Sequence, residues 1–179
     1  DLDDEFLTRT IDSILTTSKY LSNTIDDSRY FFKPLKSKED FYLSLCCNKT
    51  IDLLQANFVE KNIKIIDNIQ DVKVNGYETE LIQVLINILN NAKDALESFE
   101  NENRLIFIDI NKKNKKAFIE IKDNAGGIDP LILEKIFEPY FTTKHQTQGT
   151  GIGLYMCQEI LFKHMNGNIN ISNCEFEYK

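Results

Sequence analysis

The segment RLIFIDINKKNKKAFIEIKDNAGGIDP, residues 104–130, contains the pattern that most directly sets the fold. Apolar and polar residues alternate over 104–110 and again over 116–123, which is the period of strands with one buried face. The lysine-rich run 111–116 between them predicts a solvated hairpin loop. We therefore expect an antiparallel hairpin whose second strand ends at Asp123, shortly before a pair of glycines.

The segments on either side of this hairpin alternate between helix and strand signals. Residues 78–99 predict a long and largely buried helix, because most of its positions are apolar. An earlier helix is expected to be capped by Ser37, with Asp40 three residues on. Its apolar stripe comprises Leu43, Cys47, Ile51, Leu54 and Phe58. Shorter elements are expected as strands at 63–66, 72–74 and 167–172 and as helices at 130–137 and 153–165.

These elements predict an α+β fold in the form of a two-layer α/β sandwich, because locally paired strands have their helices gathered on one face. The chain has 179 residues, of which 42% are apolar, and this is enough for a real core. Its net charge of −7 argues against duplex nucleic acid as a partner, since phosphate binding needs a basic face. No apolar run approaches the roughly 20 residues of a membrane span, so we expect no membrane contact.

The cysteines indicate the redox compartment, and the first residue indicates whether the chain is complete. The four cysteines, Cys46, Cys47, Cys157 and Cys174, show no paired metal spacing, which is typical of reduced thiols in a cytosolic domain. The chain starts with Asp1 rather than with an initiator Met, so we expect it to be a fragment of a longer protein.

Residues 1–35 predict a separate, coiled-coil-like helix. Positions spaced alternately four and three apart carry the seam Leu7, Ile11, Ile14, Ser18, Leu21, Ile25, Ser28 and Phe32. Such a helix would pack on other helices at a shallow angle, and Pro34 would end it. The alternative is an ordinary amphipathic helix that lies on its own domain. The boundary near residue 35 divides the chain into parts 1–35 and 36–179.

Three weaker signals point to a ligand site. Asn87 and Asn91 are four residues apart on the buried helix, which suits a ligand edge or a metal-bound water, although a network of bonded core amides is an equal alternative. The stretch QGTGIGL, 148–154, opens a helix with exposed N–H groups that suit phosphate. The stretch FEPYFTTKHQTQ, 137–148, joins an apolar hinge to polar residues and is typical of a lid.

Taken in order, residues 87–91, 123–127, 137–141 and 149–153 resemble the N, G1, F and G2 boxes of sensor histidine kinases. The catalytic domain of that family has the Bergerat-type ATP-binding fold. The resemblance implies that 36–179 is such a domain, with the alternative that its last strand is missing. It implies that 1–35 is the second helix of the family's dimerization and phosphoacceptor hairpin, and hence part of a domain.

The resemblance also implies residue roles. Asn91 resembles the Mg²⁺ ligand, and Asp123 resembles the carboxylate that accepts from the adenine amino group, with a strand-end turn cap as its alternative. Lys144 resembles a phosphate contact, or else is a solvated loop lysine. Asn87, Asn91 and Lys144 are the implied catalytic residues. The implied nucleotide site comprises Asn87, Asn91, Asp94, Asp123, Ala125, Gly127, Ile128, Ile136, Phe137, Thr143, Lys144, Gly149, Thr150, Gly151, Ile152, Gly153 and Leu154.

The sequence departs from related patterns at two positions. The G1 pattern has glycine where this chain has Ala125, and we expect Ala125 to take an ordinary φ and ATP binding to persist. ATPases of the same fold, such as gyrase, carry a Glu where this chain has Asn87, and an amide cannot act as a general base. In the family that the chain resembles, the phosphoacceptor is a histidine on the first helix of the hairpin, so the resemblance implies that it lies upstream of residue 1. His145 and His164 do not lie on the leading helix and are not expected to be acceptors.

The resemblance therefore implies an ATP-dependent protein-histidine kinase that uses ATP and Mg²⁺. The γ-phosphoryl group would pass to the upstream histidine and then to an aspartate of a response-regulator receiver domain. The intact protein would be a homodimer through the helical hairpin, with this part in the cytoplasm whether or not the whole is membrane-anchored. Two alternatives are a hydrolytic ATPase of the same fold and a non-catalytic partner-binding module with a vestigial nucleotide site.

Overall fold

The computed structural model describes residues 6–11, 14–15, 18, 37–100, 103–144 and 149–176. The chain divides into two compact units, and each is described by itself. One unit contains Asp1–Leu35 and Lys135–Tyr155, and the other contains Lys36–Glu134 and Met156–Lys179.

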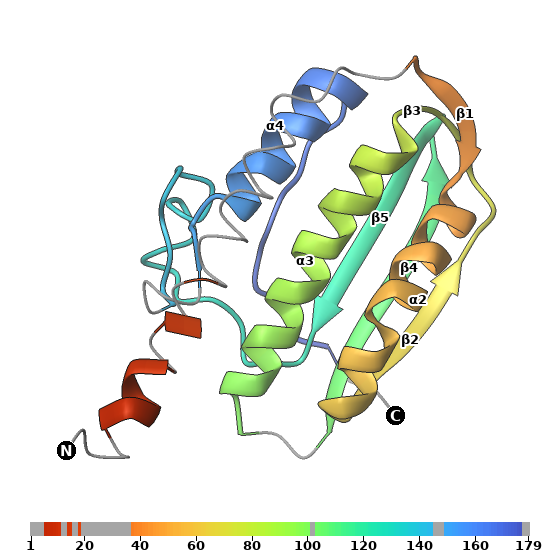
Figure 1. Cartoon of the computed structure of the whole chain (residues 1–179). Helices are drawn as coiled ribbons and strands as arrows, with labels where there is room; N and C mark the ends of the chain where they lie inside the picture. The colour runs from red at the N-terminus through yellow and green to blue at the C-terminus, as the bar shows by residue number, and fades with distance from the viewer. Residues whose placement is uncertain are drawn as a thin grey trace. The chain divides into compact units, whose positions relative to one another are not determined.

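The larger unit is built on two sheets with helices packed against them (Figure 1). Strands β1 (Glu39–Tyr42) and β3 (Lys73–Gly76) form an antiparallel pair. Strand β4 (Arg104–Lys113) is the middle strand of the other sheet, between a parallel β2 (Ile63–Ile69) and an antiparallel β5 (Lys116–Asp123). The helices of the larger unit are α2 (Leu43–Glu60) and α3 (Glu78–Ser98); a further helix, α4 (Gly153–Met165), begins in the smaller unit and belongs to the larger unit from Met156 onward. The α+β fold expected from the sequence is confirmed.

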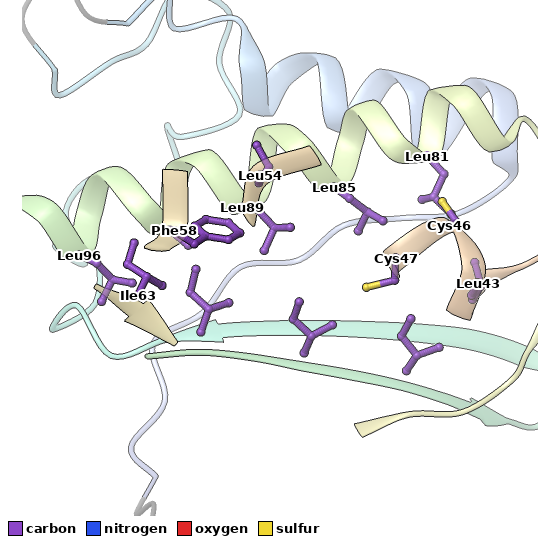
Figure 2. Packing of buried hydrophobic residues seen from close by; sticks show 14 of the residues in the cluster. Leu43, Cys46, Cys47, Leu54, Phe58, Ile63, Leu81, Leu85, Leu89 and Leu96 are labelled. Carbon is purple, nitrogen blue, oxygen red and sulfur yellow. The ribbon is translucent and has the colours of Figure 1, made fainter. Parts of the chain in front are cut away.

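The core lies between the three-stranded sheet and helices α2 and α3. Ile106, Ile108 and Ile110 alternate along β4 and are fully buried, as the two-residue period of a strand requires. The side chains of α3 that meet them recur every three to four residues, so one stripe of the helix faces the sheet. Figure 2 shows these side chains pointing toward the strands, with Leu85 and Leu89 among them.

The predicted hairpin is confirmed, with a tighter turn than the lysine-rich run suggested. Strands β4 and β5 pair as far as Lys113 and Lys116, so only Asn114 and Lys115 remain in the turn. Both have positive φ, 48° and 64°, which matches the two-residue turns whose twist fits a β-hairpin.

The expected helix start at Ser37 is wrong. The residues that follow Ser37 form β1, whose Glu39 pairs with Gly76 of β3, and α2 begins only at Leu43. Tyr42 precedes the helix without a side-chain cap, and the Leu43 N–H bonds to the Val72 carbonyl oxygen at 2.9 Å. A sheet partner some 35 residues away therefore overrides the local capping signal. The apolar stripe itself is right, since four of its members are buried: Leu43, Cys47, Leu54 and Phe58.

Two further expected elements are absent as regular structure. Residues 130–137 form a series of turns rather than a helix, with the Ile132 N–H bonded to the Asp129 carbonyl oxygen at 3.0 Å. Within this segment Leu131 is 82% exposed, whereas Ile136 is buried. Residues 167–172 are likewise outside any strand ladder.

The leading helix is described only in part. Residues 6–11, 14–15 and 18 are helical, and the seam residues Leu7, Ile11 and Ile14 are exposed. The later seam positions, Leu21, Ile25, Ser28 and Phe32, lie outside the described residues, as does Pro34. None of the described helices is long and apolar enough to cross a membrane.

Candidate functional site

The loop after β5 is organised by the side chain of Asp123. The strand ends at this residue, which pairs with Ile106 across the sheet. Its Oδ1 accepts a hydrogen bond from the Ala125 N–H at 3.0 Å, which closes an Asx turn. The turn-cap role that the sequence left open is therefore present. A carboxylate has two oxygens and several lone pairs, so this one bond does not use up its capacity to accept from a ligand.

The glycine requirement of this loop falls on residues 126 and 127. Both glycines have φ +83°, whereas Ala125 lies outside the positive-φ region, as the sequence predicted. Ala125 is instead buried in the hydrophobic core. A Cβ on Gly126 would lie 2.7 Å from Cε2 of the exposed Phe99 ring, so a side chain there would require the ring to shift in addition to the unfavourable φ.

Two asparagine side chains fasten this loop at its two ends. Oδ1 of Asn124 accepts from the Leu105 N–H at 2.9 Å, and its Nδ2 donates to the Asn103 carbonyl oxygen at 2.7 Å. Asn173 bonds in the same two-sided way to the backbone of Ile128. Neither Asn124 nor Asn173 is among the site residues predicted from the sequence. Asn124 is recognisable by its place between the strand end and the glycines, but nothing local in the sequence connects Asn173 to the loop.

Helix α3 carries the predicted amides at half-buried positions. Asn87 and Asn91 lie one turn apart, beside the buried Leu89 and Ala92. Asp94, the next predicted residue, forms an ion pair with Lys93, with 3.1 Å between Nζ and Oδ1.

Within the described ranges, no three His, Cys, Asp or Glu side chains group to hold a metal ion. Mg²⁺ is commonly held by one or two protein oxygens together with phosphates and waters, so the amide of Asn91 fits such an ion as its protein ligand.

Of the two histidines, His164 has a described environment. His164, in the last turn of α4, has Nδ1 2.8 Å from Oε2 of Glu80 in the first turn of α3. The rings of Tyr77 and His164 pack in a T-shaped arrangement, with 6.1 Å between ring centroids. His164 thus has a specific side-chain partner in addition to its place at the C-terminal end of a helix, where positive charge is favourable. His145 lies outside the described residues.

The smaller unit contains the predicted phosphate loop and part of the predicted lid. Gly151 has φ +67°, and a Cβ there would lie 2.4 Å from the carbonyl carbon of Tyr140. The segments around 140 and 151 therefore pack backbone against backbone. Gly149 has a similar constraint, since its Cβ would lie 2.9 Å from Oγ1 of Thr142. Residues 145–148 of the predicted lid lie outside the described residues.

The residues after Gly151 lead directly into helix α4. The Ile152 N–H bonds to Oγ1 of Thr150 at 3.3 Å, and α4 starts at Gly153. The first N–H groups of a helix lack intrahelical partners and carry partial positive charge, which suits a phosphate. Lys144 lies in the same unit, half-buried, with its N–H bonded to Oγ1 of Thr142 at 3.1 Å.

The predicted site residues thus fall into two sets, one in each unit. The larger unit contains Asn87, Asn91, Asp94, Asp123, Ala125, Gly127 and Ile128. The smaller unit contains Ile136, Phe137, Thr143, Lys144, Gly149, Thr150, Gly151, Ile152, Gly153 and Leu154. The chemistry of the first set suits a base and a hard cation, and that of the second suits phosphate.

Comparison with known proteins gives a consistent result. Residues 76–177 match the family described as histidine kinase-, DNA gyrase B- and HSP90-like ATPase. The two-component sensor PprA of Pseudomonas aeruginosa is 38% identical over 107 residues, which is 58% of this chain and 12% of PprA. The signal transduction histidine-protein kinase AtoS of Escherichia coli is 29% identical over 172 residues, 94% of this chain and 27% of AtoS. The chain thus spans only a small part of these relatives.

Two solved structures extend the similarity to three dimensions. The catalytic domain of histidine kinase ThkA, in a nucleotide-free form, is 31% identical with a TM-score of 0.63, covering 72% of this chain and 82% of that one. Histidine kinase ThkA in complex with the response regulator protein TrrA is 26% identical with a TM-score of 0.77, covering 97% of this chain and 49% of that one.

Proposed function

This chain belongs to the family of histidine kinase-, DNA gyrase B- and HSP90-like ATPases and carries the catalytic ATP-binding core of a histidine kinase, and we propose that it phosphorylates a histidine outside residues 1–179. The donor is the γ-phosphoryl group of ATP. The phosphoryl group then passes to an aspartate of a response-regulator receiver domain. ThkA, which has been solved with the response regulator TrrA, supports this choice of partner class.

Recognition of the base is assigned to the loop after β5. Asp123 accepts from the exocyclic amino group of adenine, and a charged acceptor facing one donor selects adenine over guanine. Gly127 lets the backbone pass close to the purine, because no side chain projects from it. The observation that carries the proposal is the prepared state of this loop, with Asp123 at its start in an Asx turn and paired glycines at φ +83°.

The phosphates are assigned to the smaller unit and to α3. The N–H groups of the glycine loop donate to phosphate oxygens, and Lys144 supplies a positive charge. These N–H groups belong to Gly149, Gly151, Gly153 and Leu154. Asn91 would hold Mg²⁺ together with the phosphates. When bound, this ion neutralises the charge that builds up on the transferred group.

The identity of residue 87 favours transfer over hydrolysis. Asn87 has no basic site with which to activate a water molecule, so the domain binds and orients ATP for an acceptor that another helix supplies. Exposed apolar residues on the leading helix, including Ile11 and Ile14, are consistent with a helical partner in a dimeric hairpin. We place this part of the protein in the cytoplasm.

Three measurements separate the proposal from its alternatives. Titration calorimetry with Mg·ADP should give saturable binding, and its absence would favour a vestigial nucleotide site. Mixing with a second chain that carries a phosphoacceptor helix and labelled ATP should yield acid-labile phosphate on that helix. Steady-state release of phosphate without an acceptor should be negligible, and rapid release would identify a hydrolytic ATPase instead.

A further inference from the structure

Asn173 makes a two-sided contact with the backbone of Ile128, 45 residues away in the sequence. The Ile128 N–H donates to Oδ1 of Asn173 at 2.8 Å, and Nδ2 of Asn173 donates to the Ile128 carbonyl oxygen at 2.6 Å. The side-chain amide thus occupies both hydrogen-bonding groups of one residue, as a neighbouring strand would. It does this where residues 167–172 form no strand ladder.

The same side chain lies against the second glycine of the loop. A Cβ on Gly127 would be 2.7 Å from Oδ1 of Asn173, inside any normal contact distance. Asn173 therefore fills the space beside Gly127 and fixes the residue that follows it. Asn124 fastens the other end of the loop to β4. The backbone of the loop is held from both sides.

We propose that Asn173 is a positioning residue for nucleotide binding, which holds Gly127 and Ile128 in the backbone conformation that accepts adenine. This inference rests on the proposed function, because it concerns the same loop. Two consecutive residues at φ +83° lie in a region that glycine alone visits readily, and glycine also leaves it readily. Without a clamp the loop populates other conformations, and the apparent Kd rises by the inverse of the competent fraction.

Because Asn173 is exposed, its role in holding the loop can be tested separately from its contribution to the free energy of unfolding. Residues 172–176 are exposed, so removing the amide uncovers little apolar surface. Loss of the clamp should therefore act on the loop far more than on the free energy of unfolding.

The test is calorimetric titration of the full chain and of Asn173→Ala with Mg·ADP and with Mg·GDP. We expect the Kd for ADP to rise about tenfold, which corresponds to a competent fraction of about one tenth. The ratio of the GDP and ADP dissociation constants should fall, because only adenine uses this loop conformation, and GDP affinity does not depend on it. Asn170→Ala is the matched control, since Asn170 is an exposed asparagine in the same segment, and it should leave both constants unchanged.

A further variant keeps the proposal testable even if Asn173→Ala does not fold. Asn173→Asp keeps the size of the side chain and the acceptor for the Ile128 N–H but loses the donor to the carbonyl oxygen, so it should fold and still weaken ADP. Gly127→Ala should weaken ADP by a smaller factor in the Asn173→Ala background than in the unmodified chain, because the collision with Oδ1 is then absent.

The outcomes distinguish a failure of the proposed function from a failure of the positioning role of Asn173. If the unmodified chain does not bind ADP, the proposed function fails. If it binds ADP and Asn173→Ala binds equally well, the positioning role is wrong. An equal loss of ADP and GDP affinity together with a large drop in melting temperature would also overturn it, because it would show a purely structural residue.

Discussion

Replacement of Asp123 by asparagine separates the two uses of this carboxylate. In the structure Oδ1 accepts from the Ala125 N–H at 3.0 Å, and an asparagine keeps an oxygen in that place. The Asx turn should therefore survive, and the free energy of unfolding should change by no more than about 0.5 kcal/mol. The negative charge is lost, and the amide now offers N–H donors where the adenine amino group needs an acceptor.

The expected cost to binding follows from the kind of bond that is lost. A hydrogen bond to a charged group contributes about 1.5–3 kcal/mol, which corresponds to a rise in the ADP dissociation constant of about 10- to 150-fold. Asp123→Ala should lose the same affinity and should also destabilise the fold, because the Ala125 N–H then loses its partner. The difference in unfolding free energy between Asp123→Asn and Asp123→Ala measures the contribution of the turn, and the loss of ADP affinity that both share measures the base contact.

The assay is titration calorimetry with Mg·ADP, accompanied by urea unfolding of each variant. Asp129→Asn is the matched control, because Oδ1 of Asp129 closes the same kind of turn with the Leu131 N–H at 2.9 Å in the same loop. It should leave ADP affinity unchanged. Equal ADP affinity of the unmodified chain and Asp123→Asn would refute the assignment of the base contact.

Three other predictions concern the metal, the thiols and a glycine. Asn91→Ala should abolish the Mg²⁺ dependence of ADP affinity, and a normal rise with Mg²⁺ in a titration series would contradict its role as ligand. Burial raises the pKa of Cys46 to about 12 and of Cys47 to about 11. Both thiols thus stay neutral in the folded chain, whereas they ionise in the unfolded chain near pH 9. The free energy of unfolding, measured with urea, should therefore fall by about 2 kcal/mol between pH 9 and pH 10. The fall should be smaller in a variant that carries both Cys46→Ala and Cys47→Ala. Gly126→Ala should cost about 1–2 kcal/mol of unfolding free energy, because alanine resists φ +83° and its Cβ meets Phe99, and an unchanged urea midpoint would argue against this geometry.

Local chemistry accounts for much of what the sequence predicted correctly. The hairpin of β4 and β5 and the helix α3 carry a strand period and a helix period over many residues, and each period is a property of the backbone alone. The ordinary φ of Ala125 followed from the cost of positive φ for any residue with a Cβ, and the structure confirms it.

The error at Ser37 has a different cause, which is that a distant partner decides the outcome. The Ser37 signal was valid locally but yielded to the pairing of β1 with β3. Residues 130–137 have a helical pattern but form turns, in which Leu131 is 82% exposed and Ile136 is buried.

By itself, the sequence therefore determined the class of fold, the order of its main elements and the residue types of the candidate site. Only the tertiary structure decided how the site loop is held, because Asn173 and Ile128 are 45 positions apart and meet through folding. Backbone periodicity and turn chemistry are encoded within a few neighbouring residues. A hydrogen bond between distant segments depends on where the whole chain places them, and no local pattern specifies that.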